Sequence, residues 1–189
     1  MHRCAWAKSE NMIAYHDTEW GVPVHDDALL FEHLFLDTMQ AGLSWACILN
    51  KRENFRKAFS GFDPRKIVRY DSRKLLRLLA DPGIIRNKLK VHAAVTNARA
   101  FLAIQKEFSS FDQYLWAYVP DRKPIINHWQ QHQQLPASTA LSDVLSKDLY
   151  KRGFKFVGST ICYAMMQAVG MVNDHTTDCF RHAQVNKYA

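Results

Sequence analysis

Residues 151–163 read KRGFKFVGSTICY, and this stretch predicts two helices joined by a short hairpin. The helix before the hairpin is expected to end at Gly153, because glycine readily adopts the left-handed conformation that stops a helix. A new helix is expected to start after Gly158, with Ser159 or Thr160 at its cap. The sequence therefore predicts a helix, a hairpin and a second helix in this region.

The hairpin also has features of a phosphate-binding site. Its turn would direct backbone N–H groups outward at the start of a helix, where hydrogen bonds and the helix dipole both stabilise an anion. The basic residues around it are Lys147, Lys151, Arg152 and Lys155. An ordinary glycine-terminated pair of helices is the alternative, and two glycines at this spacing do not separate the two interpretations.

Helical periodicity dominates the rest of the chain, and strand-like alternation is almost absent. The expected helix starts are Asp26 or Asp27, Ser44, Asp63 with Pro64, and Ser110 with Gln113 as a capping box. A long helix is expected from about Asn87 to Phe108, and an apolar stretch at 75–79 is expected to end at Gly83. Residues 119–137 lack a clear period and predict a connecting loop. We therefore expect an all-α fold, with residues 1–189 forming one domain that can divide into two helical lobes at this loop.

Composition limits the classes of function. The chain has 189 residues, and 48% of them are hydrophobic, which argues against disorder. Four cysteines in a chain of this length favour a reducing compartment, and we expect a cytoplasmic protein, because no apolar run is long enough for a membrane span or a signal peptide. The formal net charge of +7 favours an anionic partner, of which nucleic acid is the commonest.

Four potential zinc ligands form two pairs near opposite ends of the chain, Cys4 with His16 and His175 with Cys179. Two thiolates and two neutral imidazoles are one of the stable ligand sets of structural zinc. The second pair is four residues apart and is expected on one helical face. His2 and His182 lie close enough in the sequence to compete as ligands. The spacing alone leaves open an accidental pair of thiols and packed histidines.

Two segments, AYHDTEWGVP (14–23) and LDTMQAGLSW (36–45), mix aromatic with acidic and amide side chains. An enzyme that acts on a nucleobase holds the extruded base between flat side chains and reads its edge by hydrogen bonds. The candidate flat side chains are Trp6, Tyr15 and Trp45, the candidate polar readers are Asp37 and Gln40, and Gly42 and Leu43 are candidates for a turn that fills the gap left by the base. Packing of these aromatic residues in a core is the alternative.

Together, the strings QAGLSW, KRGFKFVGSTICY and NDH closely resemble the DNA-3-methyladenine glycosylase I family of helix-hairpin-helix glycosylases, from Arg3 and Cys4 almost to the C-terminus. The resemblance implies one structural zinc ion that joins the two termini. Its ligands would be Cys4, His16, His175 and Cys179. It also implies a base pocket at Trp6, Tyr15 and Trp45, in a cleft for DNA and base between the two lobes. Ser159 and Thr160, which adjoin the hairpin, would be further base contacts.

The chemistry that the resemblance implies is hydrolysis of the N-glycosidic bond of N3-methyladenine in alkylated double-stranded DNA. Tyr15, Asp37 and Trp45 would act on the base as catalytic residues, with Gln40 as a further base contact. The expected DNA contacts are Gly42, Leu43, Lys51, Arg52, Lys151, Gly153, Lys155 and Gly158. No lysine is placed as a Schiff-base nucleophile, so we expect a monofunctional enzyme. Separately, we expect this small protein to act as a monomer.

One position departs from the family. Asp37 stands where the family has a pocket glutamate, so the carboxylate is one methylene, about 1.5 Å, closer to the backbone. This difference leaves three outcomes open: normal excision of the alkylated base, altered base specificity, or a catalytically weak relative that only binds DNA. A zinc-stapled protein-interaction domain is a further alternative, against which the basic residues around the hairpin argue.

Overall fold

The computed structural model describes residues 1–188, and Ala189 lies outside the described part. Its α-helices are α1 (Glu10–Thr18), α2 (Asp27–Gln40), α3 (Trp45–Ala58), α4 (Pro64–Ile67), α5 (Ser72–Ala80), α6 (Lys88–Phe108), α7 (Phe111–Trp116), α8 (Ala140–Lys151), α9 (Ser159–Ala168) and α10 (Phe180–Asn186). Three short 3₁₀ turns, η1 (Ser60–Phe62), η2 (Pro120–Arg122) and η3 (His132–Gln134), complete the helical elements. The expected all-α class is confirmed.

Side-chain caps start the helices where the sequence predicts them. Asp26 accepts a hydrogen bond of 2.9 Å from the backbone N–H of Leu29, and Ser44 accepts one of 3.3 Å from Cys47. Asn87 does the same for the long α6. Each cap satisfies an N–H group that the first helical turn leaves without a partner.

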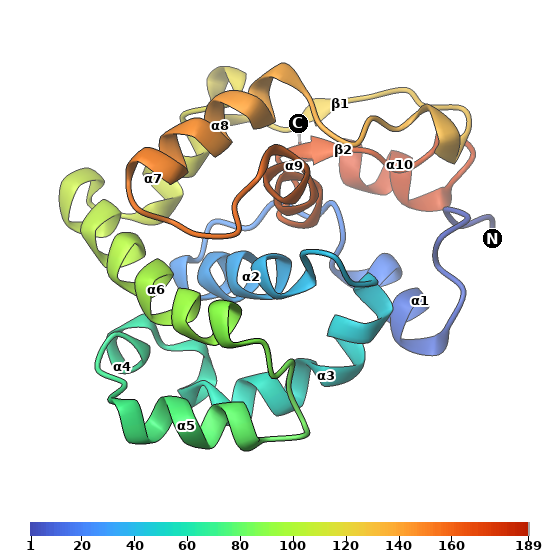
Figure 1. Cartoon of the computed structure of the whole chain (residues 1–189). Helices are drawn as coiled ribbons and strands as arrows, with labels where there is room; N and C mark the ends of the chain where they lie inside the picture. Colours follow the sequence, from blue (N-terminus) through green and yellow to red (C-terminus); the bar gives the residue numbers. More distant parts are fainter. Residues whose placement is uncertain (189) are drawn as a thin grey trace.

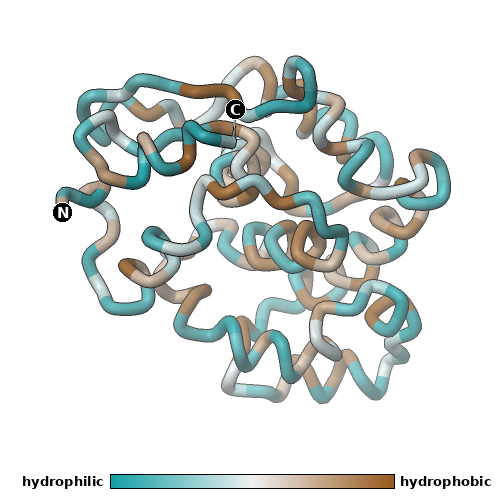
Figure 2. Tube along the Cα trace, turned by 180° about the vertical axis from the view of Figure 1, so that it is seen from behind, coloured by the Kyte–Doolittle hydropathy of each residue, from teal (hydrophilic) through white to brown (hydrophobic). Residues whose placement is uncertain are grey.

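Helix α2 lies in the middle of the molecule, where it contacts α3, α6, α7 and α9 (Figure 1). Its side chains from Leu30 to Met39 are all buried, so this helix is surrounded by protein. Most other helices show hydrophobic residues recurring between hydrophilic ones (Figure 2), as expected for helices with one face on the core. The core is rich in phenylalanine, including the stacked pair Phe101 and Phe111 with ring centroids 4.3 Å apart.

The helices α8 and α9 are joined by residues 152–158, which we call the α8–α9 turn. Gly153 has a φ of +95° and ends α8, as predicted. The cap of α9 is Gly158 and not Ser159 or Thr160, because those two residues already have helical geometry. Val157 is fully buried, and its carbonyl accepts a hydrogen bond of 2.7 Å from the hydroxyl of Ser146.

The segment 119–137 is not only a loop. Its β1 strand (Ile125–Ile126) pairs in parallel with β2 (Val172–Asn173). Two residues are too few to show a period in the sequence, so this pairing is set by contacts that only the folded chain makes. The pairing ties the segment to the region between α9 and α10.

Two helix-boundary predictions are wrong in detail. Helix α5 ends at Ala80, because Asp81 has extended backbone angles, and the N–H of Gly83 instead bonds to the Asp81 carboxylate at 2.8 Å. Ser110 caps α7, but the reciprocal bond of a capping box is not formed. Among residues 1–188, no helix combines the length and the apolarity that crossing a membrane requires.

Candidate functional site

Four potential metal ligands from the two ends of the chain meet in one buried cluster, formed by Cys4, His16, His175 and Cys179. Their ligand atoms all lie within 4.8 Å of one another. The Sγ of Cys179 is 3.4 Å from His16 Nε2 and 3.6 Å from His175 Nδ1. A tetrahedral zinc with bonds of about 2.3 Å to sulfur and 2.0 Å to nitrogen would separate these atoms by about 3.5 Å. The donor set and its spacing therefore fit zinc.

The remaining nitrogen of each histidine is held from behind. His16 Nδ1 lies 2.8 Å from Asp17 Oδ1, and His175 Nε2 donates to the carbonyl of Trp20 at 3.0 Å. Such partners orient an imidazole so that its other nitrogen is free to bind a metal. Contact with Cys4, and then with the two imidazoles, lowers the pKa of Cys179, whereas the same contact raises the pKa of Cys4. The arrangement of the side chains therefore favours the thiolate at Cys179, one of the two that a zinc site requires.

The expectation that His175 and Cys179 share a helical face is wrong. Both lie in the segment between β2 and α10, where the N–H of Cys179 bonds to the carbonyl of Thr176 at 2.8 Å. The turn brings the two side chains together without a helix. The competing histidines are elsewhere, since His2 pairs with Asp178 and His182 bonds to the carbonyl of Asn127.

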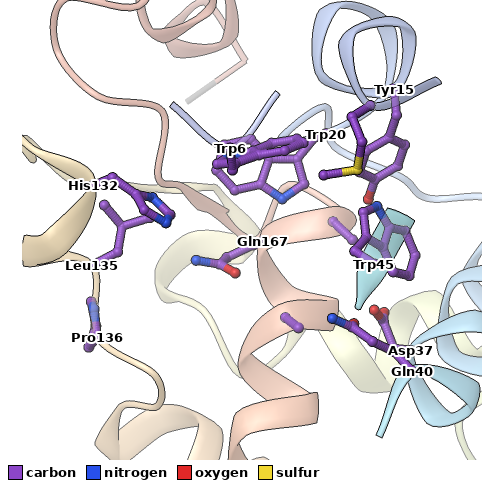
Figure 3. A pocket seen from close by; sticks show the side chains of 13 residues that line it. Trp6, Tyr15, Trp20, Asp37, Gln40, Trp45, His132, Leu135, Pro136 and Gln167 are labelled. Carbon is purple, nitrogen blue, oxygen red and sulfur yellow. The ribbon is translucent and has the colours of Figure 1, made fainter. Parts of the chain in front are cut away.

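A cavity of about 300 Å³ lies beside this cluster, because two of its lining residues, Trp6 and Trp20, contact His16 and His175. Figure 3 shows the side chains that line it. Its walls come mainly from α1, α2, α3 and α9, together with the segment around His132. The lining residues are Trp6, Met12, Tyr15, Trp20, Asp37, Gln40, Trp45, His132, Leu135, Pro136, Ala164, Gln167 and Ala168. A volume near the lower end of the range for ligand sites, about 300–1,000 Å³, suits a small, flat molecule.

Aromatic rings form one end of the cavity. Trp6 and Trp20 meet edge to face with centroids 5.0 Å apart, and the rings of Tyr15 and Trp45 lie 5.2 Å apart. In Figure 3 the hydroxyl of Tyr15 points toward Trp45. Flat apolar faces in this arrangement are suited to stacking on a planar ligand.

Two polar atoms in the cavity wall are buried without a hydrogen-bond partner, Asp37 Oδ2 and Trp45 Nε1. Burial raises the pKa of the Asp37 carboxyl well above its ordinary value. Burial, followed by the nearby charge of Asp37, also raises the pKa of Tyr15, which keeps the phenol protonated. The wall thus offers an unused donor and an unused carboxyl group to a ligand.

The cavity contains five of the seven base-contact candidates. Trp6, Tyr15, Asp37, Gln40 and Trp45 line it, and Ser159 and Thr160 do not. The hydroxyl of Ser159 instead bonds to that of Ser142 at 2.7 Å, which joins α8 to α9.

Sequence reasoning missed Trp20 and Gln167 in the cavity wall. Trp20 lies in the aromatic segment 14–23 and carries no further signal in the sequence. The Gln167 amide donates to Asp174 Oδ2 at 2.8 Å, a carboxylate that also receives the Tyr163 hydroxyl at 2.6 Å. Asp174 is buried and belongs to the NDH string. An acidic residue in this motif was the feature of the sequence from which a hydrogen-bond partner for a cavity residue such as Gln167 could have been predicted.

The candidate DNA contacts divide into exposed and engaged groups. Lys151, Lys155 and Leu43 are exposed, and Gly42 has a φ of +75° in the turn that follows α2. Lys51 donates to the carbonyls of Pro82 and Gly83.

Arg52 is engaged in an internal ion-pair network. Its guanidinium bonds to Glu32 at 2.7 Å and to Glu19 at 2.8 Å, and its side chain is only 18% exposed. The charge of Arg52 is therefore neutralised inside the protein, and a structural role accounts for it.

The fold and site together define a helical protein with a flat aromatic cavity beside a buried Cys/His cluster. The family described as methyladenine glycosylase matches residues 6–182 of the chain. DNA-3-methyladenine glycosylase 1 of Escherichia coli (strain K12) is 47% identical over 180 residues, which are 95% of this chain and 96% of the relative. The chain therefore belongs to the methyladenine glycosylase family, as its motifs predict.

Solved structures agree with this assignment. A crystal structure of a 3-methyladenine DNA glycosylase I superposes with a TM-score of 0.92 at 49% identity, covering 95% of this chain and 98% of that one. A variant of a 3-methyladenine DNA glycosylase I, solved in complex with 3-methyladenine, superposes with a TM-score of 0.91 at 34% identity and covers 95% and 97% of the two chains.

Proposed function

We propose that this protein is a base-excision repair glycosylase that extrudes N3-methyladenine from alkylated double-stranded DNA and hydrolyses its N-glycosidic bond, leaving an abasic site. The observation that carries the proposal is the pair of unpartnered polar atoms, Asp37 Oδ2 and Trp45 Nε1, in the wall of an aromatic cavity. A buried polar group without a partner costs about 1–3 kcal/mol, and the edge of a bound base would remove that cost. The names of the relatives and the complex with 3-methyladenine support this class of base.

Recognition would distinguish the lesion from adenine by charge. Alkylation at N3 makes the base cationic in DNA and a good leaving group, so little acid catalysis is needed. Tyr15 and Trp45 attract a cation through their ring faces, and the positive charge of the base would lower the raised pKa of Asp37 toward ionisation. Neutral adenine gains neither effect and would be bound less well. After the alkylated base begins to leave, water attacks the oxocarbenium-like sugar.

The reaction would proceed without a covalent intermediate on a lysine. Among the residues that the structure describes, no lysine lines the cavity. The buried amine of Lys90 is occupied by the carbonyls of Met39 and Ala41. We therefore propose a monofunctional glycosylase, and borohydride treatment during turnover is expected to trap no covalent adduct with DNA.

The metal cluster would hold one structural zinc. Its ligands would be Cys4, His16, His175 and Cys179, and four protein ligands close the coordination sphere. When bound, the ion would supply a cross-link between the N-terminal residues, through Cys4 and His16 of α1, and the segment before α10. This cross-link would join the two ends of a single domain that functions as a monomer.

DNA would contact the protein at two turns, one at the phosphate backbone and one at the position of the extruded base. We propose that α8, the α8–α9 turn and α9 act as a helix-hairpin-helix element, with amides at Gly153–Gly158 and the exposed Lys151 and Lys155 near phosphates. The turn at Gly42 and Leu43 would fill the space that the extruded base leaves. Arg52 is removed from this set, because Glu19 and Glu32 neutralise it.

The test is release of free 3-methyladenine from methylated duplex DNA by the wild type, Asp37→Asn and Asp37→Glu at matched zinc content. Release by the wild type that falls about 100-fold in Asp37→Asn supports the proposal, in line with the cost of losing one group that stabilises transition-state charge. Duplex binding without release by the wild type would identify a silent relative. Release only by Asp37→Glu would show that this chain has lost the reaction with its shorter carboxylate.

A further inference from the structure

The two turns that the proposed function places on DNA are both held by one helix that touches neither base nor phosphate in that proposal. This helix is α6, and the side chains involved are Lys90 and Asn97. They lie seven residues apart, which is close to two helical turns, so both point from the same face of α6. Both are almost completely buried, with 5% and 4% exposure.

Lys90 holds the end of α2. Its ammonium donates hydrogen bonds of 2.7 Å to the carbonyl of Met39 and 2.6 Å to that of Ala41. Carbonyls at a helix C-terminus lack helical partners, and a cation there also suits the helix dipole. Gln40, which lies between these two residues, lines the cavity, and Gly42 comes directly after Ala41. Lys90 therefore fixes the position at which the chain passes from the cavity wall into the turn at Gly42 and Leu43.

Asn97 holds the α8–α9 turn. Its amide N–H donates to the carbonyl of Lys155 at 3.0 Å, and its carbonyl accepts from the N–H of Lys155 at 2.8 Å. Both backbone groups of Lys155 are therefore satisfied by one side chain. The next residue, Phe156, has a φ of +57°, and its ring lies 6.0 Å from the Lys90 ammonium. The two holding points thus approach each other across the face of α6.

We propose that Lys90 and Asn97 are positioning residues that make α6 a rigid spacer between the two DNA-facing turns. Seven residues of helix span about 10.5 Å, and this length would set the separation at which a duplex can engage both turns at once. The inference rests on the proposed DNA-binding function and deepens it. Its consequence is that the two holding points act on duplex binding as one unit.

The first variants change each holding point with little change in size. Asn97→Asp keeps the acceptor for the Lys155 N–H but places a carboxylate against the Lys155 carbonyl, and Lys90→Met removes both donated bonds. The control is Gln105→Glu on the same helix, because Gln105 donates to Asp27 at 2.6 Å, far along α6 from both holding points. It makes the same amide-to-carboxylate change at a partly buried bond that does not serve either of the two turns.

Three quantities are measured for each variant: the Tm, the Kd for free 3-methyladenine by tryptophan fluorescence, and the Kd for a duplex carrying a tetrahydrofuran abasic analogue. Asn97→Asp is expected to weaken duplex binding about tenfold, the effect of one lost hydrogen bond, and to leave free-base binding within about twofold. Gln105→Glu is expected to lower the Tm while duplex affinity is retained. Equal loss of duplex affinity in Gln105→Glu would show a general effect of destabilisation and overturn the proposal.

The double variant Lys90→Met/Asn97→Asp decides whether α6 acts as a spacer. Changes about 10 Å apart normally have additive effects on free energy, and the contact that links the two holding points is the approach of the Lys90 ammonium to within 6.0 Å of the Phe156 ring. A spacer predicts otherwise, because the separation is already lost when one end is released, so the double variant should bind the duplex no worse than its weaker single parent. Additive losses would show two independent anchors and overturn the spacer.

Failure of this inference and failure of the proposed function are distinguishable. Release of 3-methyladenine by the wild type with additive binding losses would support the enzyme and reject the spacer. Non-additive binding losses without any base release would support the spacer and reject the enzyme.

Discussion

The imidazole of His175 donates a hydrogen bond of 3.0 Å to the main-chain carbonyl of Trp20, and the two rings meet edge to face at 4.6 Å. Trp20 also lines the cavity. A second contact of the same kind joins Trp6, another cavity residue, to His16 at 5.3 Å. The histidines of the metal-ligand cluster therefore pack directly against the tryptophans of the cavity wall. A change in the cluster is expected to alter the positions of these tryptophans.

Loss of one ligand is expected to affect stability and base binding together. Cys179→Ala should lower the zinc content and, at a cost of a few kcal/mol, lower the Tm by about 10 °C. It should also weaken binding of free 3-methyladenine, because Trp6 and Trp20 lose their support. Metal analysis, thermal unfolding and tryptophan fluorescence measure the three effects. Cys162→Ala, a buried cysteine outside the cluster, is the control. Full zinc content and an unchanged Tm in Cys179→Ala would show that the ligand assignment is wrong.

The buried carboxyl group of Asp37 in the cavity wall is expected to reduce the free energy of unfolding at neutral pH. Burial raises its pKa in the folded protein, whereas an unfolded aspartic acid titrates near about 3.9. The carboxyl of Asp37 therefore stays protonated to a higher pH in the folded protein than in the unfolded chain. The free energy of unfolding falls as the pH rises from about 4 through the raised folded pKa. Asp37→Asn should have a higher Tm than the wild type at pH 8, and the difference should shrink as the pH approaches about 4. A Tm difference that does not change over this range would contradict the raised pKa.

Arg52 and Lys155 are expected to behave oppositely, although both carry a positive charge. Arg52→Gln leaves the buried Glu32 without one of its partners and should cost about 2–3 kcal/mol. The salt dependence of its duplex binding should match that of the wild type. Lys155→Gln should leave the Tm unchanged and reduce the salt slope by about 1, as expected for one lost phosphate contact. A reduced slope in Arg52→Gln would restore it to the DNA-binding set.

Substitution of two glycines with similar backbone angles, Gly61 and Gly170, distinguishes the cost of backbone strain from the cost of a steric clash. Gly170 has a φ of +73°, and an added Cβ would lie 2.5 Å from the backbone of Val22 and Pro23. Gly61 has a φ of +70° and has open space where a Cβ would lie. Gly61→Ala should therefore cost only the strain of a left-handed residue, about 1–2 kcal/mol, whereas Gly170→Ala should cost clearly more. Denaturant unfolding of both variants measures the difference, and equal losses would show that the contact yields easily.

The sequence by itself determined the helices and most of their starts. Caps such as Asp26, Ser44 and Asn87 act on N–H groups within three residues, so the information that they use is local. The fold family could also be predicted, because whole motifs such as QAGLSW and KRGFKFVGSTICY are long enough to be specific. Of the five cavity residues named from the sequence, all except Trp6 lie in the segments 14–23 and 36–45.

Only the tertiary structure decided which groups meet across the chain. The cluster of Cys4 and His175 joins residues 171 positions apart, and the β1–β2 pair is only two residues long. Whether a basic residue faces DNA or an internal carboxylate depended on the positions of Glu19 and Glu32, which turned Arg52 inward. The hydrogen bonds of Lys90 to the end of α2 and of Asn97 to the α8–α9 turn were equally invisible in the sequence. Contacts of this kind depend on how helices pack, and packing is a property of the whole chain that short-range patterns do not encode.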